Sequence, residues 1–448
     1  MGILIKIFKR VGLGLIVLLT LLYFLAPPVA SLFVDKEFKS KFKTQMSLSD
    51  QPKRIKLTSS EKVIHRALNL DTYFGIVSST IWHFPSLIIN YFSLPTKYPK
   101  IEKDSFGVFV DSSKASIKEI LDSLKDLNIK SVAMRIYITD RYLNSSQYKK
   151  SLDLAQKLKE NGYSLMVVLA QLNETFNDNY QLLLKRVISD FSSYTDYYQT
   201  GVAINRDKWG VFNKDRFQSY IIAIYQAIKS NDPKAKIIGP SVIDFEWYYT
   251  IYYLNLVEDF IDIQGALLYV DRVGQPENTQ YGFDTIDKVR LLKAINKDKP
   301  LWITEVNWPI KDTKSYKPTS NKEAVSLDKY RDYMLRYLIE VLSTGYVERV
   351  YWWQLYAKGY GLIDHLSKKR YPAFEAYKEL IALLSDSTLI KKEFKDNQFK
   401  YSFKKDKNRF YLMWSIDEES KPTPKNLKCK SINAFLYEKL IRKISWVL

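Results

Sequence analysis

The sequence predicts a (β/α)8 barrel with additions at both ends of the chain. Eight short apolar runs, many of them rich in β-branched residues, alternate with amphipathic segments between positions 104 and 385. Such alternation is typical of parallel strands joined by helices, and eight units in about 280 residues match a barrel in number and size. An open doubly wound sheet is the alternative, but no G-x-G-x-x-G follows the first run and no P-loop occurs in the sequence.

The composition and the distribution of charge indicate a globular protein and restrict its possible partners. The chain has 448 residues, of which 46% are hydrophobic and 15% aromatic, enough for a large core. The formal net charge of +19 is concentrated at the ends, with 12 Lys/Arg against 4 Asp/Glu in residues 1–66 and 15 against 8 in residues 386–448. This distribution argues against nucleic acid as a partner and suits an anionic membrane surface or an acidic glycan. A solvated lysine-rich surface explains it equally well.

Cysteine and histidine are scarce. The single cysteine, Cys429, excludes a disulfide within the chain, and three scattered histidines argue against a histidine-built metal site. We therefore expect neither a metal nor an organic cofactor. The sequence indicates no oligomeric state.

The first 34 residues predict a membrane anchor. Three basic residues precede an uncharged run of 24 residues, Val11–Val34, which is long enough to span a bilayer. A secretory signal has a shorter apolar core. Because Val29-Ala30-Ser31 resembles a cleavage site, a removed signal peptide is the alternative.

Residues 35–103 predict a basic linker with a hydrophobic segment at 72–96. Three interpretations fit this uncharged segment: a second span, a segment lying on the membrane, and a hydrophobic lead-in packed on the barrel. Nine Lys/Arg lie between Lys36 and Arg66, and the positive-inside rule favours a cytoplasmic side for them. A single anchor with a cytoplasmic N-terminus and a pair of spans both place the main domain in the periplasm or otherwise outside the inner membrane.

The barrel elements follow in order. The predicted strands are Phe106–Val110, Ser131–Ile138, Tyr163–Ala170, Tyr198–Ile204, Ala235–Pro240, Ile263–Val270, Leu301–Val306 and Arg349–Leu355. The predicted helices are Ser116–Leu127, Gln147–Asn161, Asn179–Tyr194, Asp215–Ser230, Trp247–Phe260, Phe283–Asn296, Ser326–Thr344 and Tyr371–Leu384. In residues 386–448 the segments Phe394–Phe403 and Arg409–Ile416 alternate apolar and polar residues, which predicts a small appendage of antiparallel strands.

Chemistry in such a barrel comes from residues at the carboxyl ends of the strands. These residues are polar, hydrogen-bonding or aromatic: Asp111, Arg135, Tyr137, Gln171, Asn205, Arg206, Asp207, Asp244, Glu246, Tyr269, Asp271, Glu305, Asn307, Trp352, Trp353 and Gln354. Aromatic faces and carboxylates suit a carbohydrate, whose C–H faces stack on rings while its hydroxyls pair with polar groups. Because side chains alternate along a strand, only one of the two tryptophans points inward, and we choose Trp353.

Residues 104–385 resemble the large clan of retaining (β/α)8 glycoside hydrolases, often called clan A. The motifs are Trp302-Ile303-Thr304-Glu305-Val306-Asn307-Trp308, Tyr351-Trp352-Trp353, and Gly361-Leu362-Ile363-Asp364 with Arg370-Tyr371-Pro372-Ala373-Phe374. The resemblance implies that Glu305 is the nucleophile, supported by Tyr269 and Arg135. It also implies a tryptophan floor for the sugar, a role that we give to Trp353. A structural ion pair with Arg135 is the alternative role for Glu305.

One motif departs from that clan. The clan's fourth strand ends in a run like Gly-Asn-Glu-Pro-Asn, whose glutamate is the general acid/base, and the run here is Gly201-Val202-Ala203-Ile204-Asn205. A methyl group at Ala203 cannot protonate a leaving oxygen, and losing such assistance costs about 10²–10⁴-fold in rate. Asp207 is the first candidate to replace the glutamate, followed by Glu246 and Glu174. A loop ion pair is the alternative role for Asp207.

The expected function is a membrane-anchored glycosidase or transglycosidase that acts on a cell-envelope or capsular polysaccharide. Glu305 and Asp207 would be catalytic. Asn205 and Trp209 would join Arg135, Tyr269, Asn307 and Trp353 in binding the substrate, although Trp209 fits a loop anchor equally well. The alternative is a pseudoenzyme of the same fold that binds glycan without cleaving it, and Ala203 favours that alternative. A metal-dependent glycosyltransferase is disfavoured because no Asp-x-Asp motif occurs.

Overall fold

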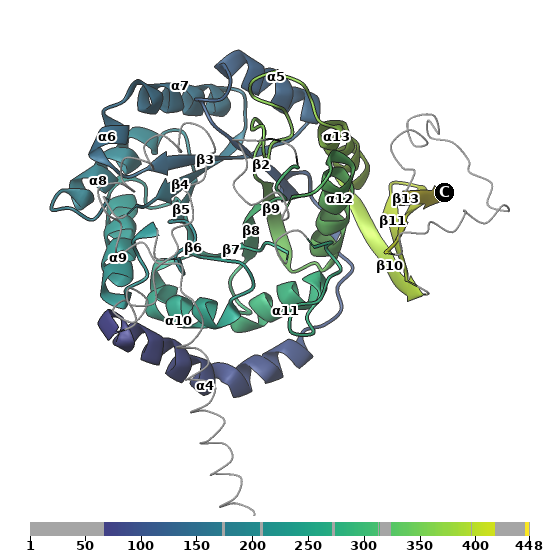
Figure 1. Cartoon of the computed structure of the whole chain (residues 1–448), viewed down its shortest axis with the longest axis horizontal. Helices are drawn as coiled ribbons and strands as arrows, with labels where there is room; N and C mark the ends of the chain where they lie inside the picture. The colour runs from purple at the N-terminus through teal and green to yellow at the C-terminus, as the bar shows by residue number, and fades with distance from the viewer. Residues whose placement is uncertain are drawn as a thin grey trace, which may run out of the picture.

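The computed structural model of the chain (Figure 1) describes residues 67–172, 175–206, 209–270, 274–311, 313, 324–395 and 397–416, and the backbone of 444–447. The predicted anchor and the whole of the basic stretch 35–66 that follows it lie outside these ranges. So do three candidate residues from the sequence analysis: Glu174, Asp207 and Asp271.

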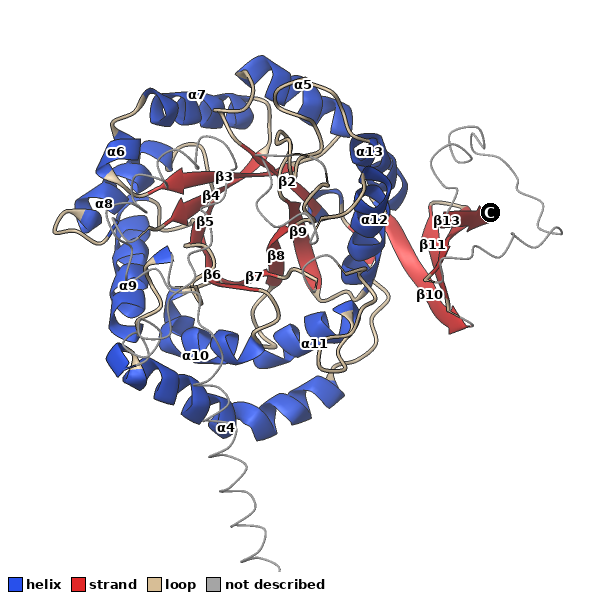
Figure 2. Cartoon of the chain, in the orientation of Figure 1, coloured by secondary structure: helices blue, strands red, loops and turns tan. Residues whose placement is uncertain are grey.

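Eight parallel strands close into a barrel in the order of the sequence (Figure 2). They are β2 (Phe106–Val110), β3 (Ser131–Tyr137), β4 (Ser164–Ala170), β5 (Tyr197–Thr200), β6 (Lys236–Ile243), β7 (Ile263–Leu267), β8 (Leu301–Val306) and β9 (Val347–Trp352). The last strand pairs with the first, since Val350 lies opposite Phe106. The predicted (β/α)8 barrel is therefore confirmed, with β2 and β8 beginning and ending at the predicted residues.

Helices surround the barrel. They are α5 (Ile117–Leu127), α6 (Asp140–Leu143), α7 (Ser146–Glu160), α8 (Tyr180–Phe191), α9 (Lys214–Asn231), α10 (Trp247–Val257), α11 (Thr285–Ile295), α12 (Leu327–Ser343) and α13 (Pro372–Leu384). Several begin where the sequence places a capping residue: Ser116 accepts a hydrogen bond from the backbone of Glu119, and Ser326 accepts one from Lys329. These caps explain why the predicted starts of α5 and α12 agree with the structure to within one residue.

Two apolar layers hold the barrel together. Along each strand one set of side chains fills the barrel interior, as Trp302 and Tyr351 do. The alternate set packs under the helices, as Ile303 and Trp352 do. This division follows from the two-residue period of a strand, and it makes the interior a packed core around which the strand ends are fixed.

The strand β5 is shorter than the sequence predicts. It ends at Thr200, whereas the apolar pattern continues to Ile204. Gly201 and Ala203 adopt positive φ values of 85° and 45°, which no strand residue can maintain. The segment after β5 is therefore a tightly turned loop at the end of the barrel.

The C-terminal residues form an antiparallel sheet, as predicted, but with different strands. The predicted single strand Phe394–Phe403 is wrong: it contains the hairpin between β10 (Ser387–Lys395) and β11 (Gln398–Lys405). Lys395 pairs with Gln398 across the turn, and Asn397 has a φ of 60°, which asparagine tolerates better than most residues. The sheet order is β1-β10-β11-β12-β13, with β1 (Lys100–Ile101), β12 (Asn408–Ser415) and β13 (Ile444–Val447).

The uncharged segment Thr72–Thr96 forms a long helix, α4 (Leu70–Ser93), outside the ring of barrel helices. Figure 1 shows α4 running along the outer side of α10 and α11. Its buried side chains are Thr72, Tyr73, Ile76 and Leu87. None of the helices in the described part of the chain combines the length and hydropathy needed to cross a bilayer.

Candidate active site

The carboxylate of Glu305 lies at the carboxyl end of β8 with both oxygens bonded. The hydroxyl of Tyr269, which follows β7, donates to Oε1 at 2.6 Å. The guanidinium of Arg135, on β3, donates from Nη2 to Oε2 and forms an ion pair with it. Glu305 is only 3% exposed, so this carboxylate depends on protein groups rather than on water for its hydrogen bonds.

Burial and charge shift the pKa values of both partners. Burial by itself lowers the pKa of Arg135, but the charge of Glu305 and the neighbouring Tyr137 outweigh it and raise that pKa above its usual value. Burial, followed by the charge of Glu305 and the hydrogen bond to it, raises the pKa of Tyr269 well above its usual value. Arg135 therefore stays cationic and Tyr269 stays a neutral hydrogen-bond donor.

Two tryptophans lie beside Arg135. The centre of its guanidinium is 3.9 Å from the ring centroid of Trp353 and 5.7 Å from that of Trp209. Such contacts stabilise a cation over an aromatic face. Trp353 also contacts Phe109 at a centroid distance of 4.7 Å. The two rings therefore help to hold Arg135 in place above Glu305.

The alternation of side chains places Trp353 and Trp352 on opposite sides of the barrel wall. Trp353 belongs to the interior cluster, whereas Trp352 packs under the helices, where its Nε1 donates to the hydroxyl of Tyr330 at 2.9 Å. Trp308 lies on the same outer side, stacked on Trp352 at 5.9 Å. Of Trp308, Trp352 and Trp353, Trp353 is therefore the one that joins Trp302 in the barrel interior.

The loop that contains Ala203 is held by a glutamine that directly follows the neighbouring strand β4. The side chain of Gln171 accepts a hydrogen bond from the backbone N–H of Val202 and donates to the carbonyl of Val202, both at 2.9 Å. A Cβ on Gly201 would lie 2.7 Å from Oε1 of Gln171, so only glycine fits there. Ala203 is buried, and its methyl group packs in the interior cluster with Trp209.

The side chain of Asn205 has a structural role. Its Oδ1 accepts from the backbone N–H of Ile243 at 2.9 Å, and its Nδ2 donates to the carbonyl of Ile243 at 3.0 Å and to Oε2 of Glu246 at 2.7 Å. These three bonds tie the loop after β5 to the end of β6. Asn205 therefore has less capacity to bind a sugar than the sequence suggests.

Glu246, a candidate to replace the missing acid, is also engaged. Its Oε2 accepts from Nη1 of Arg206 at 2.7 Å, and Nη2 of the same arginine donates to Asp244 at 2.7 Å. The two carboxylates raise the pKa of Arg206 despite its burial. Glu246 is thus already used as a hydrogen-bond acceptor by Arg206 and Asn205, an arrangement that does not suit a proton donor.

Asn307, expected to contact the substrate, is buried and donates from Nδ2 to the carbonyl oxygen of Trp353 at 2.6 Å. This bond joins the residues that follow β8 and β9. It orients Trp353 at the end of the barrel. Asn307 therefore lies behind Trp353 and is not part of the cavity wall described below.

A cavity of about 430 Å³ opens beside the Arg135 guanidinium. Arg135, Trp353 and Gln354 contribute to its wall at the strand ends. Strand-end position did not identify other wall residues, among them Lys114 and His365 in connecting loops and Arg141 in α6, because none of these three directly follows a strand. Burial, together with the charge of Lys114, lowers the pKa of His365.

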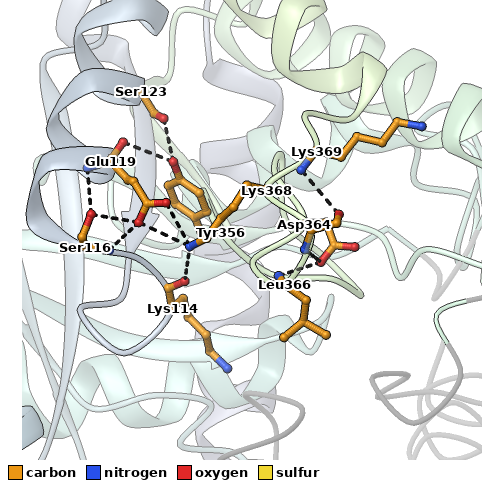
Figure 3. Close-up of polar contacts among 10 residues, drawn as sticks. Lys114, Ser116, Glu119, Ser123, Tyr356, Asp364, Leu366, Lys368 and Lys369 are labelled. Carbon is orange, nitrogen blue, oxygen red and sulfur yellow. Dashed lines mark hydrogen bonds and ion pairs between the residues drawn. The ribbon is translucent and has the colours of Figure 1, made fainter.

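The loop between β9 and α13 forms one wall of this cavity and is fixed to α5 (Figure 3). Lys368 donates from Nζ to the carbonyl of Lys114 and to Oε2 of Glu119, each at 3.3 Å. Tyr356 bonds to Ser123 at 2.9 Å. Asp364 accepts from the backbone N–H of Leu366 at 2.9 Å. The Gly361–Asp364 motif therefore shapes the loop that carries His365.

The structure brings most of the predicted site residues together and separates others. Glu305, Tyr269, Arg135 and Trp353 form one connected group with Trp209 next to it. Asn205 and Asn307 lie in the supporting structure around that group. Asp207 lies outside the described residues.

Solved glycoside hydrolases share this fold. A family 39 glycoside hydrolase from the gut symbiont Bacteroides cellulosilyticus WH2 has a TM-score of 0.53 at 13% identity, covering 73% of this chain and 76% of that chain. A glucosidase from Croceicoccus marinus has a TM-score of 0.53 at 13% identity, covering 71% and 76%. A GH51 arabinofuranosidase from Xanthomonas axonopodis pv. citri has a TM-score of 0.50 at 11% identity, covering 73% and 84%. No protein-family model and no curated protein sequence matches the chain. The likeness therefore shows the barrel fold of glycoside hydrolases.

Proposed function

We propose that this chain is a membrane-anchored glycosidase or transglycosidase in which Glu305 is the nucleophile. One observation carries the proposal: the Glu305 carboxylate is held at the end of β8 by Tyr269 and by the cationic Arg135. A retaining glycosidase needs an ionised carboxylate in a fixed orientation at this end of the barrel. Arg135 places a positive charge beside one carboxylate oxygen, and the hydrogen bond from Tyr269 fixes the rotation of the carboxylate.

In the proposed reaction, an oxygen of Glu305 bonds to the anomeric carbon of the sugar. The bond from that carbon to the leaving oxygen breaks at the same time, and the leaving oxygen takes a proton. Water, or a sugar hydroxyl in a transfer reaction, then attacks the glycosyl ester, gives its proton to the group that protonated the leaving oxygen, and releases the Glu305 carboxylate. Neither step requires a metal or an organic cofactor.

The proposed mechanism needs a group that donates a proton to the leaving oxygen. With Ala203 at the position of the clan's acid/base, we assign that role to Asp207, which follows the same loop in the sequence. Without a carboxyl there, the barrel would favour substrates with good leaving groups or glycosyl transfer. Acid assistance contributes about 10²–10⁴-fold, so its loss slows the reaction on ordinary glycosides without abolishing the role of Glu305.

The substrate we propose is a cell-envelope or capsular polysaccharide, outside the inner membrane. The predicted N-terminal anchor supports this location, because it would hold the barrel next to the envelope. The cavity beside Arg135 and Trp353 has space for a sugar unit and offers both charged and aromatic groups. Its wall also contains Lys114 and Arg141, which suits a sugar that carries acidic groups.

Covalent labelling tests the role of Glu305. Dinitrophenyl fluoroglycosides with fluorine next to the anomeric carbon need little acid assistance and leave a stable glycosyl ester. We expect at least one member of a gluco, galacto, xylo and manno panel to add its sugar to Glu305, detected by peptide mass spectrometry. The Glu305→Gln variant should remain unlabelled. Labelling of a different carboxylate would refute the assignment.

A second candidate is glycan binding without cleavage. The specific observation in its favour is that Glu305 is buried with both oxygens bonded, next to a buried Ala203. This candidate predicts that calorimetry detects polysaccharide binding equally in the natural chain and in Glu305→Gln, with no labelling by the panel. Glu305-dependent release of reducing sugar would exclude it.

A further inference from the structure

The helix α4 has polar contacts on the side that faces the barrel. Tyr91 donates to Asp287 of α11 at 2.7 Å, and Asn90 donates to the carbonyl of Ala294 at 3.0 Å. Ser79 accepts from Asn255 of α10 at 3.1 Å. These bonds fix which side of α4 faces the barrel.

The close approach of α4 to the barrel confirms this orientation. A Cβ added to Gly75 would lie 2.6 Å from the ring of Tyr252 on α10, so the backbone of α4 touches that ring. Tyr73 contacts Phe212 with a centroid distance of 5.2 Å. The inner side of α4 is therefore in close contact with the barrel, and these contacts prevent the helix from rotating to bury its other side.

The opposite side of α4 is apolar and exposed. Phe74 is 73% exposed, Trp82 81%, Ile89 67% and Phe92 77%. Ile81 and Ile88 are exposed on the same side, because positions 74, 81, 88 and 92 follow the helical repeat. No charged residue interrupts residues 72–96. A surface helix normally shows the reverse arrangement, with its apolar stripe toward the core.

This apolar side differs from ordinary exposed hydrophobic residues. Leu182 on α8, for example, is exposed but lies apart from the others named here. Single exposed residues need no explanation, whereas a contiguous apolar strip along several helical turns marks a contact surface. The strip runs along most of a helix of 24 residues.

We propose that the outer side of α4 lies in the boundary between lipid headgroups and acyl chains of a membrane. Three features select lipid as the occupant. The exposed side combines tryptophan and phenylalanine with isoleucine, which is typical of helices that lie in a membrane surface. The preceding residues 35–66 carry nine Lys/Arg, which attract anionic headgroups. The uncharged run 11–34 predicts an anchor in the same membrane.

The proposal orients the barrel. Figure 1 looks along the barrel, and α4 lies across the outside of the ring in that view. With the outer side of α4 in the membrane surface, the barrel axis runs along the membrane plane. The end of the barrel that carries Glu305 then opens sideways, beside the membrane. This orientation is independent of the proposed glycosidase activity.

A lipid-depth measurement on the full chain tests the proposal. The background is Cys429→Ser, which removes the only cysteine. A fluorescent nitrobenzoxadiazole probe is attached at Ile81→Cys on α4 or, as the matched control, at Lys150→Cys on the exposed surface of α7. Each protein is reconstituted in phosphatidylcholine–phosphatidylglycerol vesicles. We expect nitroxide placed near the headgroups to remove most of the fluorescence at position 81 and to leave position 150 unchanged. A helix of this kind inserts about 5–10 Å into the boundary.

Other occupants give different results. If aqueous iodide quenches the fluorescence at position 81 and lipid nitroxide does not, the outer side of α4 faces water. Protection from both quenchers would show a protein cover, either the run 11–34 or a second copy of the chain. Both results overturn the proposal. As a second variant, Phe74→Glu with Ile89→Glu should abolish lipid quenching at position 81, whereas Leu182→Glu should not.

Discussion

At the scale of single residues, the guanidinium of Arg135 has three neighbours that matter for the site. It bonds to the Glu305 carboxylate, and its faces lie against the rings of Trp353 and Trp209. The side chains of Arg135 and Glu305 are 5% and 4% exposed, so each charge is neutralised almost entirely by the other. Removing either one alone leaves a buried charge.

The first prediction concerns this ion pair. Arg135→Met should lower the free energy of unfolding by about 3–5 kcal/mol, because it leaves the carboxylate buried without a partner. The double variant Arg135→Met with Glu305→Gln should recover most of this loss. Urea unfolding of the three proteins, followed by near-UV circular dichroism, measures the difference. Equal stability of Arg135→Met and the natural chain would show that water reaches Glu305.

The second prediction separates orientation from binding. Tyr269→Phe removes a hydrogen bond to a charged carboxylate, worth about 1.5–3 kcal/mol. The rate at which a fluoroglycoside labels Glu305 should therefore fall about 10–100-fold, while glycan affinity in calorimetry stays the same. Tyr281→Phe, at an exposed tyrosine in the same β7–α11 connection, is the control and should not change the rate. An unchanged rate in Tyr269→Phe would remove Tyr269 from the proposed mechanism.

At the scale of elements, local sequence patterns predicted most boundaries, and long-range contacts decided the exceptions. The apolar run that predicted a strand to Ile204 is real, but Gln171, which follows β4, bonds to the Val202 backbone and holds the chain in a turn. The hairpin between β10 and β11 was missed because the alternation continues on both sides of its two-residue turn. In α5, by contrast, the Ser116–Glu119 capping box is a local signal, and the predicted start was correct to within one residue.

The third prediction tests that capping box. Ser116 accepts from the backbone N–H of Glu119 at 3.2 Å, and the Glu119 carboxylate accepts from the backbone N–H of Ser116 at 2.8 Å. Ser116→Ala should lower the free energy of unfolding by about 0.5–2 kcal/mol. Ser189→Ala, on the exposed side of α8, should change it by less than about 0.5 kcal/mol. Urea unfolding measures both, and equal effects would show that the cap contributes nothing.

At the scale of the whole molecule, a buried charged cluster joins the barrel to the C-terminal sheet. Glu277, in the connection before α11, accepts from Nε of Arg336 on α12 and from Nε1 of Trp414 on β12, both at 2.6 Å. Glu340 on α12 is buried nearby. Burial, followed by the charge of Glu277, raises the pKa of Glu340 well above its usual value.

The fourth prediction follows from the sign of that shift. A carboxyl whose pKa is raised by folding supports the fold below its unfolded value of about 4.5 and loses this contribution as the pH rises toward the folded value. At pH 7 the free energy of unfolding of Glu340→Gln should therefore be about 1–3 kcal/mol higher than that of the natural chain, because the substitution removes a buried carboxyl group that is costly to ionise. The difference should shrink toward pH 4.

Thermal and urea unfolding between pH 4 and 8 measure this dependence. Asp153→Asn removes an exposed carboxylate on α7 and serves as the control for the change in net charge. If the free energies of unfolding of Glu340→Gln and the natural chain differ by the same amount at all these pH values, the Glu340 carboxyl does not titrate in the way that its burial implies.

The sequence by itself determined the barrel, the order of its strands, and the position of Glu305 at a strand end. It also determined that Trp352 and Trp353 face opposite sides of the barrel wall, because the two-residue period of a strand is a local property of the chain. The structure decided that Trp353 is the one that faces inward. The tertiary structure alone decided that Asn205 bonds to Glu246, 41 residues away, and that Trp414 bonds to Glu277, 137 residues away. It also decided which side of α4 faces the barrel, since the composition of residues 72–96 fits a span, a surface helix and a packed helix alike. Contacts between distant residues depend on how whole elements pack, and no local period encodes that packing.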